Sequence, residues 1–196
     1  MAKPKMVLEA FRQFDKANSK DPNTEMYKGK LYPKEVLYAR RMTEKLDDFA
    51  PNASESLQLT ARCQHICRWE IPRDAYEMNR TGYLRWRQDL KKFHVEKASE
   101  ILRDVGYDRE LIDQVAFLLE KKQLKKSEDT QTLEDVICLV FLEFYFEDFL
   151  QKHPEDKLVD ILKKTWRKMS LKGQETALRL PLSTTALDLV SKAIGP

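Results

Sequence analysis

The segment TLEDVICLVFLEFYFEDFL, residues 132–150, is the most apolar stretch of the chain. A helix drawn through it carries apolar side chains on nearly every side, and such a helix belongs in the interior of a domain. The side chains expected in the core are Val136, Ile137, Leu139, Val140, Phe141, Phe144 and Phe146. The segment therefore predicts a central buried helix and favours an all-α fold.

The rest of the chain also follows the period of an amphipathic helix, and no alternating strand pattern of five residues occurs. Residues 18–29 are expected to form a loop, because proline, asparagine and glycine interrupt them. Helices are expected over residues 7–17, 33–49, 54–69, 82–105, 108–122, 132–150, 154–169 and 185–194. The sequence thus predicts about eight helices in a single all-α domain over residues 1–196, with its core at residues 33–170.

The composition of the chain excludes several classes of protein. The 35 Lys and Arg against 32 Asp and Glu give a net charge of +3, too small to identify a nucleic-acid-binding protein. The five glycines are too widely spaced for a dinucleotide fingerprint or a P-loop. No apolar run approaches the roughly 20 residues that span a bilayer, so no membrane partner is expected. Three cysteines are typical of free thiols in a reducing compartment, which points to the cytosol, with the nucleus as an alternative.

Arginine and aromatic residues are interleaved over residues 62–92, where six Arg and two Lys face four Asp and Glu. The planar guanidinium suits phosphate or carboxylate, and aromatic rings can stack on a base. The ligand-binding residues expected here are Arg62, Arg68, Arg73, Arg80 and Trp86. One alternative is a solvated surface on which each arginine pairs with a neighbouring acid. Another is an RNA-binding face shared with residues 163–168.

Two histidines and one acid form a further candidate site. His94 is spaced so that it shares a helix face with Ala98 and Leu102, where a histidine is ordinarily a hydrogen-bonded core residue. Thr132 and Asp135 have the spacing of a capping box, which is a purely structural motif. By themselves, His65, His94 and Asp135 therefore support either a structural or a metal-binding interpretation.

Taken together, the order of these residues resembles that of the HD phosphohydrolase superfamily, an all-helical, metal-dependent fold. Residues 57–65 look like the helix that ends in the His-Asp doublet of that superfamily. Residues 94–106 look like its additional histidine helix, and residues 133–136 look like the helix that bears its final Asp. The resemblance covers about residues 33–150 and rests on short motifs.

The HD resemblance implies a divalent metal and a set of catalytic residues. The implied metal ligands are His65, His94 and Asp135, with His65 also catalytic and Glu134 as a proton shuttle. Two departures affect this reading, because Ile66 stands at the Asp of the doublet and Tyr38 at the first His. The remaining residues would form a mixed site completed by water, or the fold has lost its metal and kept an arginine-lined pocket.

From about Val7 onward, the chain also resembles an uncharacterised helical family of fungi and bacteria, a domain of unknown function. The strings that carry this resemblance are residues 64–73, 82–87, 133–136 and 164–166. Some members carry a glutamyl-tRNA synthetase label, and residues 65–68 with 163–170 faintly echo the class I synthetase signatures. Those signatures need a parallel sheet and a glycine beside ATP, whereas this chain shows no strand pattern and has Cys67 at that place. We therefore reject the synthetase interpretation.

These observations predict a metal-dependent phosphohydrolase or a binding protein for a small phosphorylated compound, with a nucleotide favoured. A bound divalent metal would polarise a phosphoryl oxygen and activate water. The ligand would be bound by Arg62, Arg68, Arg73, Arg80, Trp86, Lys121 and Lys164. The alternative is a non-catalytic helical module that binds RNA or protein through its Arg/Trp-rich face.

Overall fold

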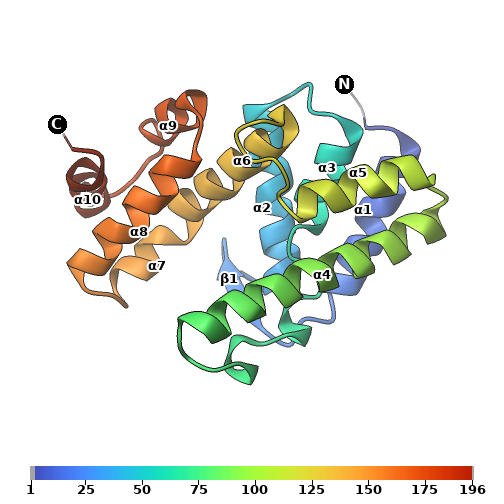
Figure 1. The fold of residues 1–196 in the computed structure, drawn as a ribbon, viewed down its shortest axis with the longest axis horizontal. Coiled ribbons are helices and arrows are strands. Elements are labelled where there is room, and N and C mark those ends of the chain that lie inside the picture. Colours follow the sequence, from blue (N-terminus) through green and yellow to red (C-terminus); the bar gives the residue numbers. More distant parts are fainter. Residues whose placement is uncertain (1–2, 196) are drawn as a thin grey trace. The chain divides into compact units, whose positions relative to one another are not determined.

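The computed structural model describes residues 3–195 (Figure 1). Ten α-helices and one β-hairpin are present in the described chain, so the helical class is confirmed and the predicted number of helices was too low. The chain divides into two compact units, residues 1–122 and residues 123–196. The organisation of the whole chain as a single domain stays a prediction.

The first unit holds five α-helices, a hairpin and two short 3₁₀ helices. In chain order these are α1 (Lys5–Asn18), β1 (Thr24–Tyr27), β2 (Lys30–Pro33), α2 (Lys34–Phe49), α3 (Glu55–Cys63), η1 (Arg68–Glu70), η2 (Arg73–Ala75), α4 (Arg80–Val105) and α5 (Arg109–Leu119). The helix starts follow the sequence signals closely. Ser54 and Asp108 accept hydrogen bonds from the first turns of α3 and α5, and Gly106 ends α4 with a left-handed φ of 101°.

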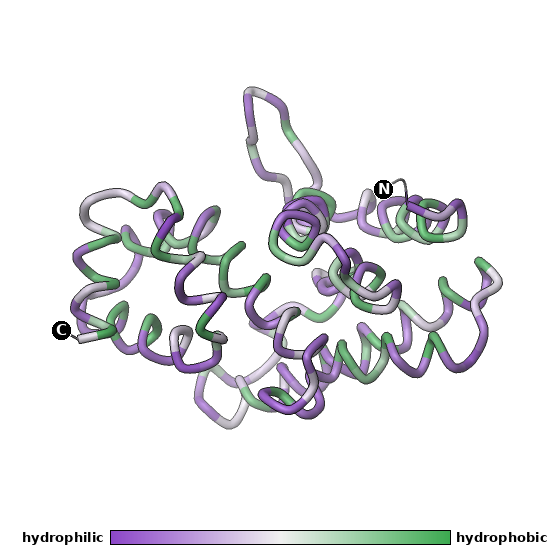
Figure 2. The backbone as a smooth tube through the Cα atoms, turned by 90° about the horizontal axis from the view of Figure 1, so that it is seen from above, coloured by the Kyte–Doolittle hydropathy of each residue, from purple (hydrophilic) through white to green (hydrophobic). Residues whose placement is uncertain are grey.

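The hairpin corrects the prediction of a simple loop at residues 18–29. Its strands pair antiparallel, with Tyr27 opposite Lys30. Lys28 (φ 48°) and Gly29 (φ 74°) both adopt the left-handed conformation that a two-residue type I′ turn requires. Strands of four residues are too short to show a five-residue alternation, which is why the sequence pattern missed them. The hairpin extends away from the helix that follows it (Figure 2).

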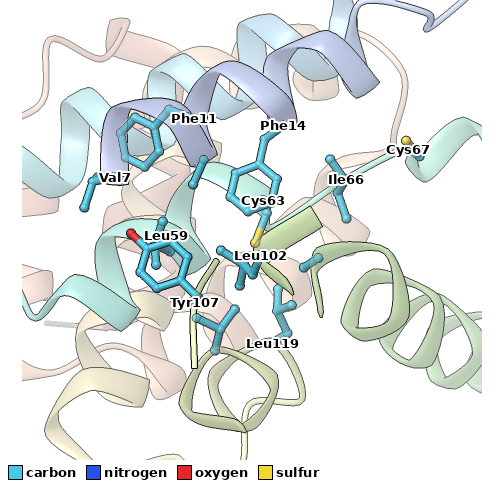
Figure 3. Close-up of a cluster of buried hydrophobic side chains, with 13 residues drawn as sticks. Val7, Phe11, Phe14, Leu59, Cys63, Ile66, Cys67, Leu102, Tyr107 and Leu119 are labelled. Carbon is cyan, nitrogen blue, oxygen red and sulfur yellow. The ribbon is translucent and has the colours of Figure 1, made fainter. Parts of the chain in front are cut away.

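One cluster of buried apolar side chains in the first unit lies among α1, α3, α4 and α5 (Figure 3). Its fully buried side chains recur at the helical period along each of these helices, as an amphipathic helix requires. The central members are Val7, Phe14, Leu59, Cys63, Ile66, Ala98 and Leu102. Cys63, Cys67 and Cys138 are buried and form no disulfide among residues 3–195, as expected for thiols that pack as small apolar groups.

The second unit consists of five helices, α6 (Glu128–Phe144), α7 (Phe146–Leu150), α8 (Glu155–Lys168), α9 (Leu171–Ala177) and α10 (Thr184–Ile194). Val136, Leu139 and Val140 of α6 have no exposed surface. Ile137, Phe141 and Phe144, which were also expected in the core, are only partly buried, so the predicted burial is confirmed for one face of the helix and not for its whole circumference. The predicted continuous helix to residue 150 was wrong, because the backbone turns at Tyr145 (φ −125°). That turn brings the ring of Phe146 edge-on to Phe141, with ring centroids 5.8 Å apart. The short helix α9 was not predicted.

Across residues 3–195, no helix has both the length and the apolar character needed to cross a membrane.

Candidate functional site

A tight turn after α3 places His65 and Arg68 beside each other. The predicted helix over residues 54–69 ends instead at Cys63, and Cys67 takes a left-handed φ of 50°. The Cys67 N–H donates to Oδ1 of Asn18, 2.9 Å away, which fixes the turn to α1. Ile66 is fully buried in the core (Figure 3), so the position of the doublet's Asp faces apolar side chains. His65, by contrast, keeps 24% of its side-chain surface exposed.

The imidazole of His65 lies between a carboxyl group and a guanidinium. Nη1 of Arg68 lies 3.3 Å from His65 Nε2, and Oε2 of Glu35 lies 3.4 Å from His65 Nδ1. Because a guanidinium can only donate, Nε2 accepts, and a neutral ring then carries its proton on Nδ1, facing Glu35. Tyr38 stacks on the ring with centroids 4.0 Å apart and planes within 9°. The position that the HD resemblance gives to a first histidine therefore holds a stacked tyrosine.

Helix α4 contributes a second histidine and a tryptophan to this cluster. The ring of His94 lies 6.0 Å from that of His65, and its buried Nε2 has no hydrogen-bond partner among the described residues. The Trp86 ring lies 4.9 Å from Cζ of Arg68 and is oriented by a hydrogen bond from Nε1 to the carbonyl of Ile71. We call Glu35, Tyr38, His65, Arg68, Trp86 and His94 the His65 cluster.

Burial and nearby positive charge set the protonation of the cluster. Burial raises the pKa of Glu35 to about 7, against the opposing effect of Arg68. Burial also lowers the pKa of His94 to about 2 and holds the pKa of His65 well below its usual range. The cations that lower the pKa of His65 further are Arg68, Lys121, Arg87 and Lys34. Both histidines are therefore neutral at pH 7 within a positively charged environment.

The cluster does not fit a divalent cation. Nε2 of His65 already faces a guanidinium, and four cationic side chains act on its ring. In the described part of the chain, no group of three His, Cys, Asp or Glu side chains is arranged to hold a metal ion. An excess of positive charge with a weakly ionised carboxyl favours an anion instead. The metal held by His65, His94 and Asp135 stays a prediction from the resemblance.

The comparisons with known proteins identify the family of the chain. The model of DUF4202, a domain of unknown function, matches residues 8–190. The chain belongs to the DUF4202 family. No curated protein and no solved structure matches it. Membership confirms the resemblance to an uncharacterised helical family, and it assigns no activity to this DUF4202 chain.

Two arginines of the predicted ligand site are engaged in contacts within the first unit. Arg62 donates from Nε and Nη2 to the carboxylate of Asp15, at 2.9 and 2.6 Å, and from Nη1 to Thr43. This bidentate pair joins α3 to α1. Arg73 donates to three backbone carbonyls between residues 76 and 79, so it holds a loop together. Arg80 is exposed in the first turn of α4.

The predicted site residues of the second unit have local partners. Asp135 accepts hydrogen bonds from the backbone N–H and the hydroxyl of Ser170, at 2.7 and 2.5 Å, and from Gln131. Ser170 in turn caps α9, so Asp135 supports the start of that helix. Glu134 is buried and lies 3.4 Å from Lys168. Lys164 is exposed and pairs with Asp160 one turn earlier on α8.

The structure adds Lys34, Glu35 and Arg87, which the sequence did not assign to a site, and it brings Tyr38, at the position of the first His in the HD resemblance, onto the His65 ring. One signal for Glu35 was available. It precedes Met42 by seven residues and Leu46 by eleven on α2, so it falls on the buried face of that helix. An acid on an apolar helix face is unusual and marks a candidate functional residue. No comparable signal distinguishes Arg87 from Arg85 or Arg80.

Proposed function

We propose that this protein binds the phosphoryl group of a small phosphorylated compound at the His65 cluster. The observation that carries the proposal is the environment of Arg68. Among the described residues, the one hydrogen bond of its half-buried guanidinium goes to an imidazole nitrogen, and Trp86 lies against it. A guanidinium in such a setting retains N–H donors for a ligand, and its planar fork matches two oxygens of a phosphoryl group.

The charges around Arg68 support an anionic ligand. Burial lowers the pKa of the Arg68 guanidinium, and the like charge of Arg87 nearby lowers it further. Glu35 is the carboxyl group within the cluster, and burial raises its pKa to about 7, so it is only partly ionised at neutral pH. A phosphoryl group would offset this repulsion among cations, which is why a phosphorylated ligand is favoured over a neutral one.

The proposal also includes an HD-like arrangement of the site residues and hydrolysis of the ligand. Both follow from the resemblance to the HD phosphohydrolase superfamily. The contact between Tyr38 and His65 supports the arrangement, because the resemblance gives these two positions to ligands of one site. Hydrolysis would need a group that accepts a proton from water. His65 is the candidate that the resemblance offers, and its Nε2 could accept that proton once a bound phosphoryl group takes over the Arg68 N–H that now faces this nitrogen.

The proposal predicts that inorganic phosphate raises the melting temperature of the protein. A ligand that binds only the folded state stabilises it by about 2.7 kcal/mol at one hundred times its Kd. Arg68→Gln should remove this shift, and Arg68→Lys should remove most of it, because a point charge replaces neither the fork nor the contact with Trp86. The measurement is differential scanning fluorimetry with phosphate, against chloride at equal ionic strength.

Arg103→Gln serves as the matched control, because Arg103 is exposed in the last turn of α4, away from the cluster in sequence. This variant should keep the full response to phosphate. Equal shifts for the wild type and Arg68→Gln would contradict the proposal. A response to an RNA oligomer alone, steeply weakened by salt, would favour the RNA-binding alternative.

A further inference from the structure

We infer that the ligand of the His65 cluster carries a planar ring, and that Tyr83 is the platform on which this ring stacks. The inference rests on the proposed function and names the ligand class, a mononucleotide in place of a sugar phosphate or inorganic phosphate. Tyr83 is 45% exposed, although it belongs to a group of rings and guanidinium groups that runs to Arg68.

The spacing of this group matches the two ends of a nucleotide. The Trp86 ring lies 4.9 Å from Cζ of Arg68 and 5.9 Å from the Tyr83 ring. Tyr83 is also near enough to affect the pKa of Arg68. The Arg68 guanidinium, which is proposed to bind phosphate, and the exposed Tyr83 ring therefore both adjoin the ring of Trp86. A compact ligand with a phosphoryl group at one end and a base at the other can reach both.

Arg73 holds the Tyr83 ring in place without covering all of it. The Arg73 Cζ lies 6.0 Å from the centroid of Tyr83 and 5.9 Å from that of Trp86. Its guanidinium is itself fixed, because it donates to the carbonyls of Tyr76, Glu77 and Asn79 at 3.1, 2.7 and 3.3 Å. A guanidinium beside one part of a ring leaves the exposed part available for stacking. Arg73 is thus a positioning residue for Tyr83.

The first turn of α4 is rigid for a second reason. Asn79 caps the helix by accepting a hydrogen bond from the N–H of Gly82, 2.8 Å away. Gly82 is needed there, because a Cβ at this position would lie 2.1 Å from the carbonyl oxygen of Glu77. The loop from Arg73 to Asn79 is therefore pressed against the helix turn that carries Tyr83. An exposed aromatic side chain on a turn this constrained loses little conformational entropy when a base stacks on it, so ordering the side chain costs little binding free energy.

The charge of this surface fits the same ligand. Arg68, Arg73 and Arg87 belong to the group or adjoin it. Two acids near Tyr83 in the sequence already accept hydrogen bonds, Asp89 from the hydroxyl of Tyr76 and Glu77 from the side-chain amide of Asn79. An anionic ligand with an aromatic base satisfies both the cations and the exposed ring. Stacking of one base on an aromatic side chain contributes a gain in affinity of about tenfold.

The test compares ligands that differ only in the ring. AMP, GMP, CMP and UMP are titrated into the full chain by isothermal titration calorimetry, beside ribose 5-phosphate and inorganic phosphate. At least one nucleotide should bind about ten times more tightly than ribose 5-phosphate. Tyr83→Ala should lower the affinity for that nucleotide to the affinity for ribose 5-phosphate. The affinity for ribose 5-phosphate itself should not change. Tyr83→Phe should keep the preference, because the ring and not the hydroxyl provides the stacking surface.

Leu84→Ala is the matched control, since Leu84 is the next residue on the same helix turn and is 57% exposed. It should keep the nucleotide preference. The inference is overturned if no nucleotide exceeds ribose 5-phosphate, or if Tyr83→Ala keeps the full preference while its melting temperature shows a folded protein. Failure of the proposed function looks different, because then inorganic phosphate and ribose 5-phosphate also give no heat of binding.

Discussion

Val140→Asp is expected to unfold the second unit. Val140 lies in the middle of α6 and has no exposed surface. An Asp side chain there would be buried without a partner, which costs several kcal/mol or more. Domains of this size are stable by only about 5–15 kcal/mol, so most of the stability would be lost. Thermal unfolding followed by circular dichroism at 222 nm measures the effect.

The matched control for this substitution is Leu187→Asp. Leu187 lies in α10 of the same unit and is 40% exposed, so the new carboxylate can remain in water. Its free energy of unfolding should change by about 1 kcal/mol at most, mainly through helix propensity. A Val140→Asp variant that melts at the temperature of the wild type would show that α6 lies outside the core.

Asp135→Ala is expected to destabilise the second unit by about 3 kcal/mol. The buried carboxylate accepts three hydrogen bonds, two from Ser170 and one from Gln131. The variant removes all three, and Gln131 keeps only its hydrogen bond to the carbonyl of Lys168. Gly173→Ala should destabilise the same contact without removing the carboxylate, because its Cβ would lie 2.6 Å from Oδ1 of Asp135. Urea denaturation of the metal-free protein measures both changes.

This second prediction also separates two roles for Asp135. If Asp135 served only as a metal ligand, the metal-free Asp135→Ala variant would be as stable as the metal-free wild type. If the carboxylate is structural, Asp135→Ala shows the full expected loss in unfolding free energy even when a chelator is present. Asp160→Ala is the control, because Asp160 is exposed and, within the part of the chain that the structure describes, pairs with Lys164 one turn away on the same helix. Such a surface pair contributes about 0.5 kcal/mol, so this variant should resemble the wild type.

The helical class and many helix ends could be predicted because they depend on neighbouring residues. The start of α2 after Pro33, the Asp108 cap of α5 and the end of α4 at Gly106 all follow from groups within one turn. The buried face of α6 was predicted for the same reason, since a helix with apolar residues all round has no other stable place. The family resemblance could also be stated from short strings, and the DUF4202 match confirms it.

Errors in the predicted elements arose where a few residues take special conformations. The helix predicted to residue 69 stops at Cys63, because Cys67 adopts a left-handed conformation secured by Asn18, 49 residues earlier in the sequence. The hairpin depends on the left-handed pair Lys28 and Gly29, of which only the glycine is a recognisable turn residue. Hydrophobic periodicity contains no information on either conformation.

The sequence by itself determined that this protein is helical, and that its arginines and histidines are numerous enough around residues 62–94 to form a site. Only the tertiary structure decided which of them meet. Arg62 pairs with Asp15 and Arg73 holds a loop, whereas Arg68 faces His65 and Glu35. The physical reason is that periodicity reports which face of a helix is buried, while the partner of a polar side chain depends on how α2, the turn after α3, and α4 pack together. The contacts of His65 with Glu35, Tyr38 and His94 join residues 27 to 30 positions apart, and no local pattern encodes them.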